Sequence, residues 1–147
     1  MRIHHIIILA TALYITGCSS SGSIEQTTKA MNAVKQVDAS KDHTVAISVL
    51  HDSFLQSRNT SQYNETVVDV SGEVVAFSLS EDNLYTVTLR DGESDAVCVF
   101  DSSISGDIGD GRTVNRGAKI TIRGKCFTSG LFSSNPFTID GCHIVNN

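Results

Sequence analysis

Hydrophobic positions follow two spacings along the chain, and the change between them separates a helical segment from a β-rich one. In residues 44–56, Ile47, Leu50 and Phe54 recur at intervals of three and four, which places them on one face of a helix. From residue 66 onward the apolar positions mostly recur at intervals of two, the period of a half-buried strand. The pattern therefore predicts one short helix followed by a β domain.

Five strands are predicted in the β part, beginning near residues 66, 85, 96, 119 and 137. In the first of them, the apolar set changes from even positions such as Val70 to odd positions such as Phe77, and Gly72 lies near the change. A β-bulge inserts one residue and shifts the parity in this way. A second change at residues 141–142 predicts a second bulge in the last strand.

The order of the elements predicts a mainly β fold, a five-stranded OB-fold barrel preceded by one short helix. Three strands, a glycine-rich connector at residues 102–117 and two more strands give the order of the OB fold, a partly open Greek-key barrel. A five-stranded open sheet is the alternative. The two parity changes favour the barrel, because a strand that bends in its middle can pair on two sides of a small closed sheet.

The N-terminal residues have the pattern of an export signal. Arg2 precedes an apolar run over residues 6–15, which is too short to span a bilayer. The run ends in Ile-Thr-Gly-Cys at residues 15–18, which resembles the lipobox of bacterial lipoproteins. The resemblance implies that residues 1–17 are removed and that acyl chains, palmitate among them, are attached to Cys18. The alternative is an ordinary signal peptide in which the cysteine stands by chance.

Two parts are expected in the mature chain: a lipidated flexible tether over residues 18–43, with a weak helix around residues 31–37, and an OB-fold domain over residues 44–147. Removal of the signal takes away Arg2 and no acidic residue, so the formal charge changes from −5 to −6. Because anionic lipid does not attract an acidic chain, the chain must be held at the bilayer through acylated Cys18. A serine at position 19 favours the outer membrane, with the domain facing the periplasm.

Four stretches of the β part carry a family resemblance. They lie at residues 63–74, 97–100, 117–126 and 139–145, and include GAKITIRGKC at residues 117–126. Together with the helix that contains Leu50 and Phe54, they resemble the tRNA_anti-like family of small exported bacterial proteins and lipoproteins. The glycine-rich connector departs from the helix usual at that point in the family. The resemblance implies an OB fold for residues 44–147 and no particular ligand, since the function of most members is unknown.

Besides Cys18, the chain contains Cys98, Cys126 and Cys142. Export implies an oxidising compartment in which disulfides persist. If the last two strands form a hairpin centred on Ser134, positions 126 and 142 lie opposite each other, which predicts a Cys126–Cys142 disulfide. The rival pair is Cys98–Cys142, because strands three and five are neighbours in an OB barrel. No metal site is expected, since structural zinc sites contain a closely spaced cysteine pair.

No residue pattern for catalysis or for a cofactor is present. The three histidines of the mature chain, His43, His51 and His143, stand in no catalytic motif, and His143 points away from Cys142 on a strand. The acidic residues of the connector, among them Asp101, lack the spacing of a calcium loop and are interpreted as polar turns. The sequence therefore predicts that the protein is not an enzyme.

The candidate binding surface is the outer face of the second and third strands, which OB domains commonly use for ligands. Here it would carry Thr86, Thr88 and Arg90, and the loop between strands four and five adds Leu131 and Phe132. These two apolar residues mark a partner contact, unless they fold back over the barrel mouth. The face has no aromatic side chain and a single arginine, which favours an envelope protein, a peptide or a glycan over nucleic acid.

The sequence thus predicts a membrane-anchored, non-enzymatic OB-fold binding or structural module in the bacterial envelope. The alternative is an OB-type nucleic-acid-binding lipoprotein, for example one in DNA uptake or transfer. The two hypotheses differ in the salt dependence of oligonucleotide binding, because phosphate contacts release counterions.

Overall fold

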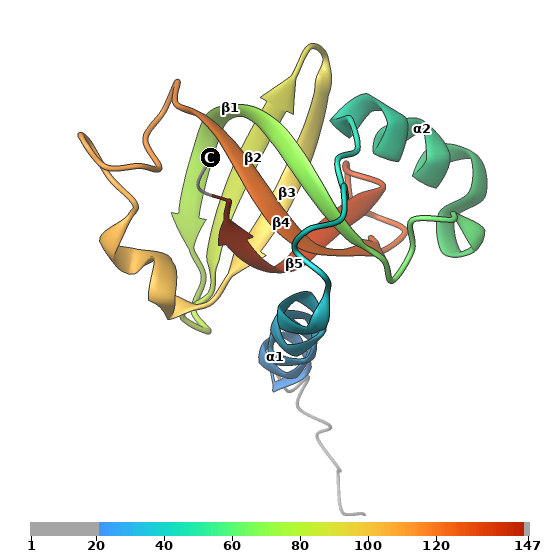
Figure 1. Ribbon diagram of the computed structural model, residues 1–147, viewed down its shortest axis with the longest axis horizontal. Helices are drawn as coiled ribbons and strands as arrows, with labels where there is room; N and C mark the ends of the chain where they lie inside the picture. The colour runs from blue at the N-terminus through green and yellow to red at the C-terminus, as the bar shows by residue number, and fades with distance from the viewer. Residues whose placement is uncertain (1–20, 146–147) are drawn as a thin grey trace, which may run out of the picture.

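The five strands form one closed barrel in the computed structural model, which describes residues 21–145 (Figure 1). The strands are β1 (Val67–Leu79), β2 (Tyr85–Asp91), β3 (Ser94–Phe100), β4 (Lys119–Thr128) and β5 (Phe137–Ile144). They follow one another around the barrel in the order β1-β2-β3-β5-β4, and β4 pairs back to β1. All these pairs are antiparallel except β3 with β5. The OB-fold prediction is confirmed, and the open-sheet alternative is wrong.

Strand β1 closes the barrel because it bends and pairs on both sides. Residues 67–73 pair with β4, and residues 73–79 pair with β2. The predicted bulge is present between Val74 and Ala76, slightly beyond Gly72. A β-carbon at Gly72 would lie 2.8 Å from the carbonyl oxygen of Arg90, so this glycine lets β1 and β2 approach each other at the bend.

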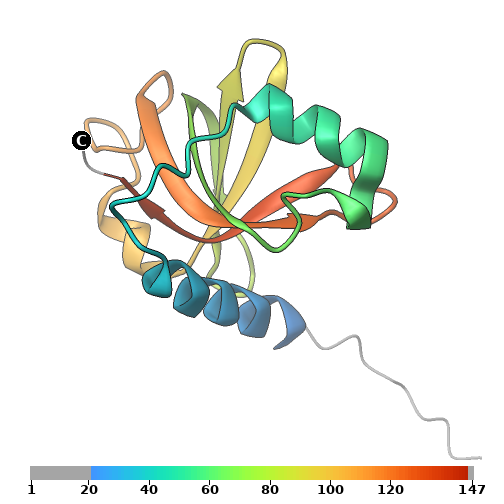
Figure 2. The ribbon, with the colours of Figure 1, turned by 45° about the vertical axis from the view of Figure 1, so that its right-hand side comes forward.

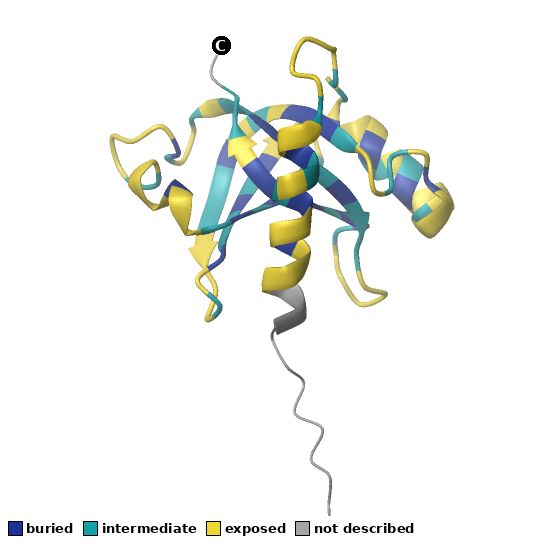
Figure 3. Cartoon of the chain, turned by 60° about the horizontal axis from the view of Figure 1, so that its bottom comes forward, coloured by how far each residue is buried: buried dark blue, intermediate teal, exposed yellow. Residues whose placement is uncertain are grey.

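Helix α2 (Ile47–Ser57) closes one end of the barrel and confirms the predicted helix. Ile47, Leu50 and Phe54 are fully buried on its inner face, and the ring of Phe54 stacks on Phe137 at a centroid distance of 5.3 Å. These side chains join the inward-facing residues of the strands in one apolar core. The burial pattern in Figure 3 follows this division between the inside and the outside of the barrel.

Helix α1 (Ser21–Gln36) occupies most of the segment that was expected to be a flexible tether. It lies across β5 and β4 on the outside of the barrel (Figure 2), with Thr27, Ala30 and Val34 buried at spacings of three and four. The prediction of one helix before the barrel is therefore wrong, because α1 and α2 both precede it. The inner face of α1 is made of small residues, which gave only the weak helical pattern expected near residues 31–37.

Strand β5 contains the second predicted bulge. The β4–β5 register shifts between Arg123 and Lys125, and Gly141 has a positive φ of 64°. A β-carbon at this position would collide with the backbone of α1 at Ala30 and Met31. Gly141 therefore both turns the strand and leaves room for α1.

The connector between β3 and β4 contains only a single short 3-10 helix, η2 (Ser102–Gly106), in place of a longer helix. The side chain of Asp101 caps it by accepting a hydrogen bond from the backbone N–H of Ser103 at 3.0 Å. Across residues 21–145, none of the helices has the length and apolar character needed to cross a bilayer. The expected signal peptide and Cys18 lie outside the described residues.

Candidate ligand-binding face

The outer surface of β2 and β3 carries hydroxyl and small aliphatic side chains. In the β2–β3 register, Thr86 lies opposite Val99, and Thr88 lies opposite Val97. All four side chains are half-buried, and they alternate with fully buried Val87 and Cys98. Helix α1 packs on the other side of the barrel, against β5 and β4, so it leaves this face open. Arg90 and Asp95 are also paired across these two strands, and we call the six residues together the β2–β3 face.

Arg90 ends the β2–β3 face in a bidentate ion pair with Asp95. Its Nε and Nη2 donate to the two carboxylate oxygens of Asp95 at 2.7 and 2.8 Å. The hydrogen bonds and charge of Arg90 hold the pKa of Asp95 below its ordinary value. The sequence placed Arg90 here as the one positive charge of the face, and the structure shows this charge already paired within the protein.

Leu131 and Phe132 are fully exposed at the tip of the loop that joins β4 to β5. Their exposed fractions are 78% and 103%, so neither side chain folds back over the barrel mouth. In Figures 1 and 2 the loop lies beside the C-terminal end of α2, whereas the β2–β3 hairpin lies near the N-terminal end of that helix. The structure therefore separates these two residues from Thr86, Thr88 and Arg90, with which the sequence had grouped them.

The three described cysteines are free thiols inside the barrel, and the expected Cys126–Cys142 disulfide is not formed. The hairpin is not centred as predicted: Cys126 pairs in register with Ile139, and the bulge at Gly141 displaces Cys142 from it. The Cys142 thiol instead donates to the carbonyl of Ile139 at 3.2 Å. The rival Cys98–Cys142 disulfide is also absent. Burial raises the pKa of both Cys126 and Cys142, which favours the protonated thiol at each position.

We expect the three interior thiols to be hidden in the native protein and countable after unfolding. A thiol-reactive chromophore should label none of them in buffer, and should label three per chain in denaturant without reductant, because all three are free and buried. Prior reduction is the control and should leave the count unchanged. A count of one in denaturant that rises to three after reduction would show an interior disulfide.

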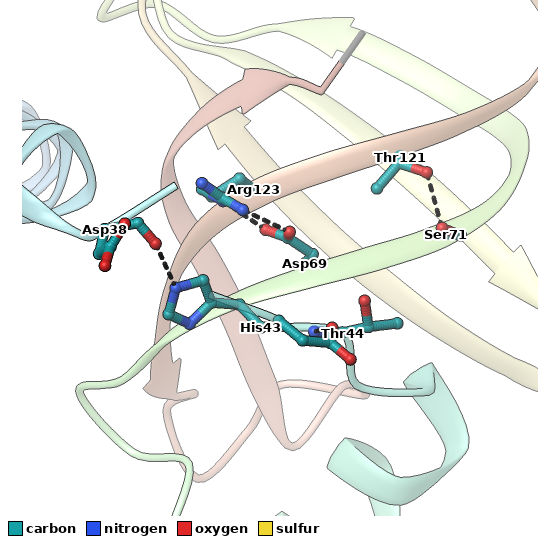
Figure 4. Close-up of polar contacts among 8 residues, drawn as sticks. Asp38, His43, Thr44, Asp69, Ser71, Thr121 and Arg123 are labelled. Atoms are coloured by element: carbon teal, nitrogen blue, oxygen red, sulfur yellow. Dashed lines mark hydrogen bonds and ion pairs between the residues drawn. The ribbon is translucent and has the colours of Figure 1, made fainter. Parts of the chain in front are cut away.

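A buried ion pair joins β1 to β4 on the outer side of the barrel (Figure 4). Nε and Nη2 of Arg123 donate to the carboxylate oxygens of Asp69 at 2.6 and 2.7 Å, and their side chains are only 9% and 11% exposed. The backbone of Asp69 is also paired with the segment before α2, through His43 and Val45. The two hydrogen bonds of this ion pair fix the register of β1 against β4, and the backbone hydrogen bonds of Asp69 fix the path of the chain into α2.

Asp140 links α1 to β5. Its carboxylate accepts hydrogen bonds from Gln26 Nε2 at 2.6 Å and from Thr27 Oγ1 at 3.2 Å. Burial raises the pKa of Asp140, and the two hydrogen bonds from α1 oppose this rise. Neither this role of Asp140 nor the full extent of α1 was predicted from the sequence. The only available signal was the spacing of Thr27, Ala30 and Val34, which is helical but weakly apolar.

Neither the histidines nor the acidic connector residues gather into a site. Over residues 21–145, no group of three or more His, Cys, Asp or Glu side chains is placed to hold a metal ion. Asp101 caps η2, and Asp110 is exposed to solvent. His143 lies opposite Arg123 in the β4–β5 register and also faces outward. In the described residues, the candidate functional features are therefore two surface regions, the β2–β3 face and the loop between β4 and β5.

The barrel and its open face define an OB-fold domain, and the comparisons with known proteins support the same fold. No protein-family model and no curated protein matches the chain. Among solved structures, the chain is similar to a "putative nucleic acid-binding lipoprotein" from Klebsiella pneumoniae. The TM-score is 0.57 at 22% sequence identity, and the match covers 78% of this chain and 97% of the Klebsiella chain. At this level of identity the likeness establishes the fold.

Aminoacyl-tRNA synthetases give weaker matches. A "putative aspartyl-tRNA synthetase" from Leishmania major matches with a TM-score of 0.48 and 12% identity, over 74% of this chain and 22% of the synthetase. Asparaginyl-tRNA synthetase from Pyrococcus horikoshii matches with a TM-score of 0.43 and 9% identity, over 57% of this chain and 20% of the enzyme. The chain thus spans only about a fifth of either synthetase.

Proposed function

We propose that this protein is a lipid-anchored, non-catalytic OB-fold binding module of a bacterial envelope. The observation that carries the proposal is the β2–β3 face, a stretch of strand surface that is left open by α1 on the surface where OB domains commonly bind. Half-buried threonine and valine side chains there offer hydroxyl groups and apolar contact area together. No step of bond making or breaking is assigned to it.

The anchor in this proposal is Cys18, acylated after cleavage of residues 1–17. The apolar run and the lipobox-like residues 15–18 support it, and so does the word lipoprotein in the name of the similar Klebsiella protein. Several acyl chains on one residue hold a protein firmly on a membrane, whereas one chain holds it weakly. Serine at position 19 supports placement on the outer membrane, facing the periplasm.

A nucleic acid is the ligand class that the comparison supports best, because the similar Klebsiella protein is named for such binding. The β2–β3 face would then contact bases and sugars chiefly through Thr86 and Thr88. Its only arginine, Arg90, is already paired with Asp95. We therefore expect a shallow salt dependence, because few phosphate charges would be neutralised.

A protein, a peptide or a glycan of the envelope is the second candidate. The specific observation that favours it is the chemistry of the β2–β3 face, which contains no aromatic side chain on which a base could stack. Base stacking on aromatic rings supplies much of the affinity of OB domains for single strands.

Titration of a fluorescent single-stranded oligonucleotide with the mature protein in detergent tests the proposal. If nucleic acid is the ligand, anisotropy should rise on binding and change little from about 50 to about 200 mM salt. Thr88→Glu should abolish the rise, because a carboxylate in the middle of the face repels phosphate. Thr28→Glu, at an exposed position of α1 on the other side of the barrel, is the control and should bind normally.

Two results would decide against parts of this proposal. Oligonucleotide binding that is equal in Thr88→Glu and wild type would mean that the β2–β3 face is not the site. No binding at low salt would exclude the first ligand class, and envelope proteins and glycans captured by wild type but lost with Thr88→Glu would then support the second. Separately, a Cys18→Ser chain should leave the membrane fraction if residue 18 is the anchor.

A further inference from the structure

The loop between β4 and β5, residues 129–136, presents two large apolar side chains on a preformed turn. The N–H of Ser133 donates to the carbonyl of Gly130 at 3.0 Å, which puts Leu131 and Phe132 at the two central positions of a β-turn. Such positions usually hold glycine, proline or small polar residues. The N–H of Ser129 donates to the carbonyl of Pro136 at 3.0 Å and closes the base of the loop. These two hydrogen bonds therefore hold Leu131 and Phe132 at the tip of a structured loop.

The loop carries no charged residue, and its apolar tip is fully exposed. Two large apolar side chains next to each other on an exposed turn form a small apolar patch, and such patches can mark a contact with a partner or a membrane. Because the loop is uncharged, an apolar medium could receive its tip without the desolvation of any ion.

The tip lies at the end of the barrel from which α1 begins. Lys125 and Phe127, at the end of β4 just before the loop, line the same groove as Glu25 and Lys29 in the first turns of α1. In Figures 2 and 3 the loop and the N-terminal end of α1 point to the same side of the molecule. Ile24, in the first turn of the helix, is also 45% exposed there.

The expected anchor holds this end of the barrel close to the bilayer. Cys18 stands three residues before Ser21, where α1 begins, and three residues extend to at most about 11 Å. Helix α1 is fixed to the barrel and does not lengthen the tether. Its residues Thr27, Ala30 and Val34 are buried, and Gln26 donates a hydrogen bond to Asp140. An acylated residue 18 therefore brings the barrel to the lipid surface with the α1 start and the β4–β5 loop foremost.

From this geometry we infer that Leu131 and Phe132 insert into the membrane to which the chain is anchored, as a second point of contact that orients the barrel. The inference rests on the proposed anchor. The lipid contact is apolar, so it does not require anionic headgroups, in agreement with the net negative charge of the protein. The β2–β3 face, which lies away from α1, then remains open to the periplasmic side.

A single tryptophan can test this contact, because the chain contains none. Mature acylated protein carrying Phe132→Trp is placed in phosphatidylcholine vesicles, with and without brominated acyl chains. We expect its emission to shift to the blue and to be quenched by the brominated lipid. Val49→Trp is the matched control: Val49 is also exposed, at 47%, but lies in the first turn of α2, beside the β2–β3 hairpin and away from the start of α1, and should stay unquenched.

An indole at position 132 that is no more quenched than one at position 49, in protein that is bound to vesicles, would overturn the inference. A blue shift that needs no vesicles and grows with protein concentration would assign the tip to a second copy of the chain, and would also overturn it. If mass spectrometry finds no acyl group on Cys18, the anchor proposal fails by itself. The same quenching is then measured on protein coupled through the Cys18 thiol to a maleimide lipid, so the contact of the tip is still decided.

Discussion

Replacing Arg123 by methionine should lower the free energy of unfolding by about 3 kcal/mol, because it leaves the Asp69 carboxylate buried without a partner. The two side chains are about nine-tenths buried, at 9% and 11% exposure, and make two short hydrogen bonds. Denaturation in urea, followed by circular dichroism, measures the change. The double replacement Asp69→Leu with Arg123→Met should recover most of the loss, because the cost arises from the orphaned charge.

Arg90→Met is the matched control for this prediction. Arg90 and Asp95 form the same bidentate pair between neighbouring strands, but the Arg90 side chain is 52% exposed. Water replaces the lost partner at such a site, so the unfolding curve should barely move. Equal losses for Arg123→Met and Arg90→Met would contradict the structure, since they would mean that burial of the Asp69–Arg123 pair has no effect.

Replacing Gly141 by valine should detach α1 from the barrel and cost about 3 kcal/mol of stability. The position has a φ of 64°, which a β-branched residue adopts with difficulty, and its β-carbon would meet the backbone of α1 at Ala30. Chemical denaturation measures the loss. Brief trypsin digestion reports the detachment, because Lys29 and Lys35 of α1 should become cleavable.

Gly130→Ala is the control for the Gly141 substitution, because nothing lies within 4 Å of a β-carbon at position 130. It should leave both the stability and the digestion pattern close to those of the wild type. Rapid cleavage at Lys29 and Lys35 in the wild-type protein would contradict the docked position of α1.

Most of the barrel could be predicted from the chain because its strands are half-buried. Alternation of apolar and polar residues located β2, β3 and β4, and the two parity changes located the bends in β1 and β5. The register of β4 against β5 could not be obtained in this way. It depends on where the loop turns and on which side of Gly141 the extra residue falls, and an error of this kind produced the false disulfide between Cys126 and Cys142.

Helix α1 and the separation of the two surface features escaped prediction for a different reason. The buried side chains of α1 are small, so docking of the helix depends on the space beside Gly141 and on the hydrogen bonds of Asp140. Both residues are far from α1 in the sequence. Similarly, the exposure of Phe132 follows from a turn that points away from the barrel, and sequence alone could not distinguish this from folding inward. In each case a contact between distant parts of the chain decides the outcome.

Helix α1, the first described element, docks on β5, the last strand, and this sets an order on folding. Its contacts there are the hydrogen bond from Gln26 to Asp140 and the close approach of Ala30 to Gly141. The helix therefore has no docking place until β5 has paired in the barrel. While β5 is unpaired, the inner face of α1, which includes Thr27, Ala30 and Val34, stays exposed to solvent.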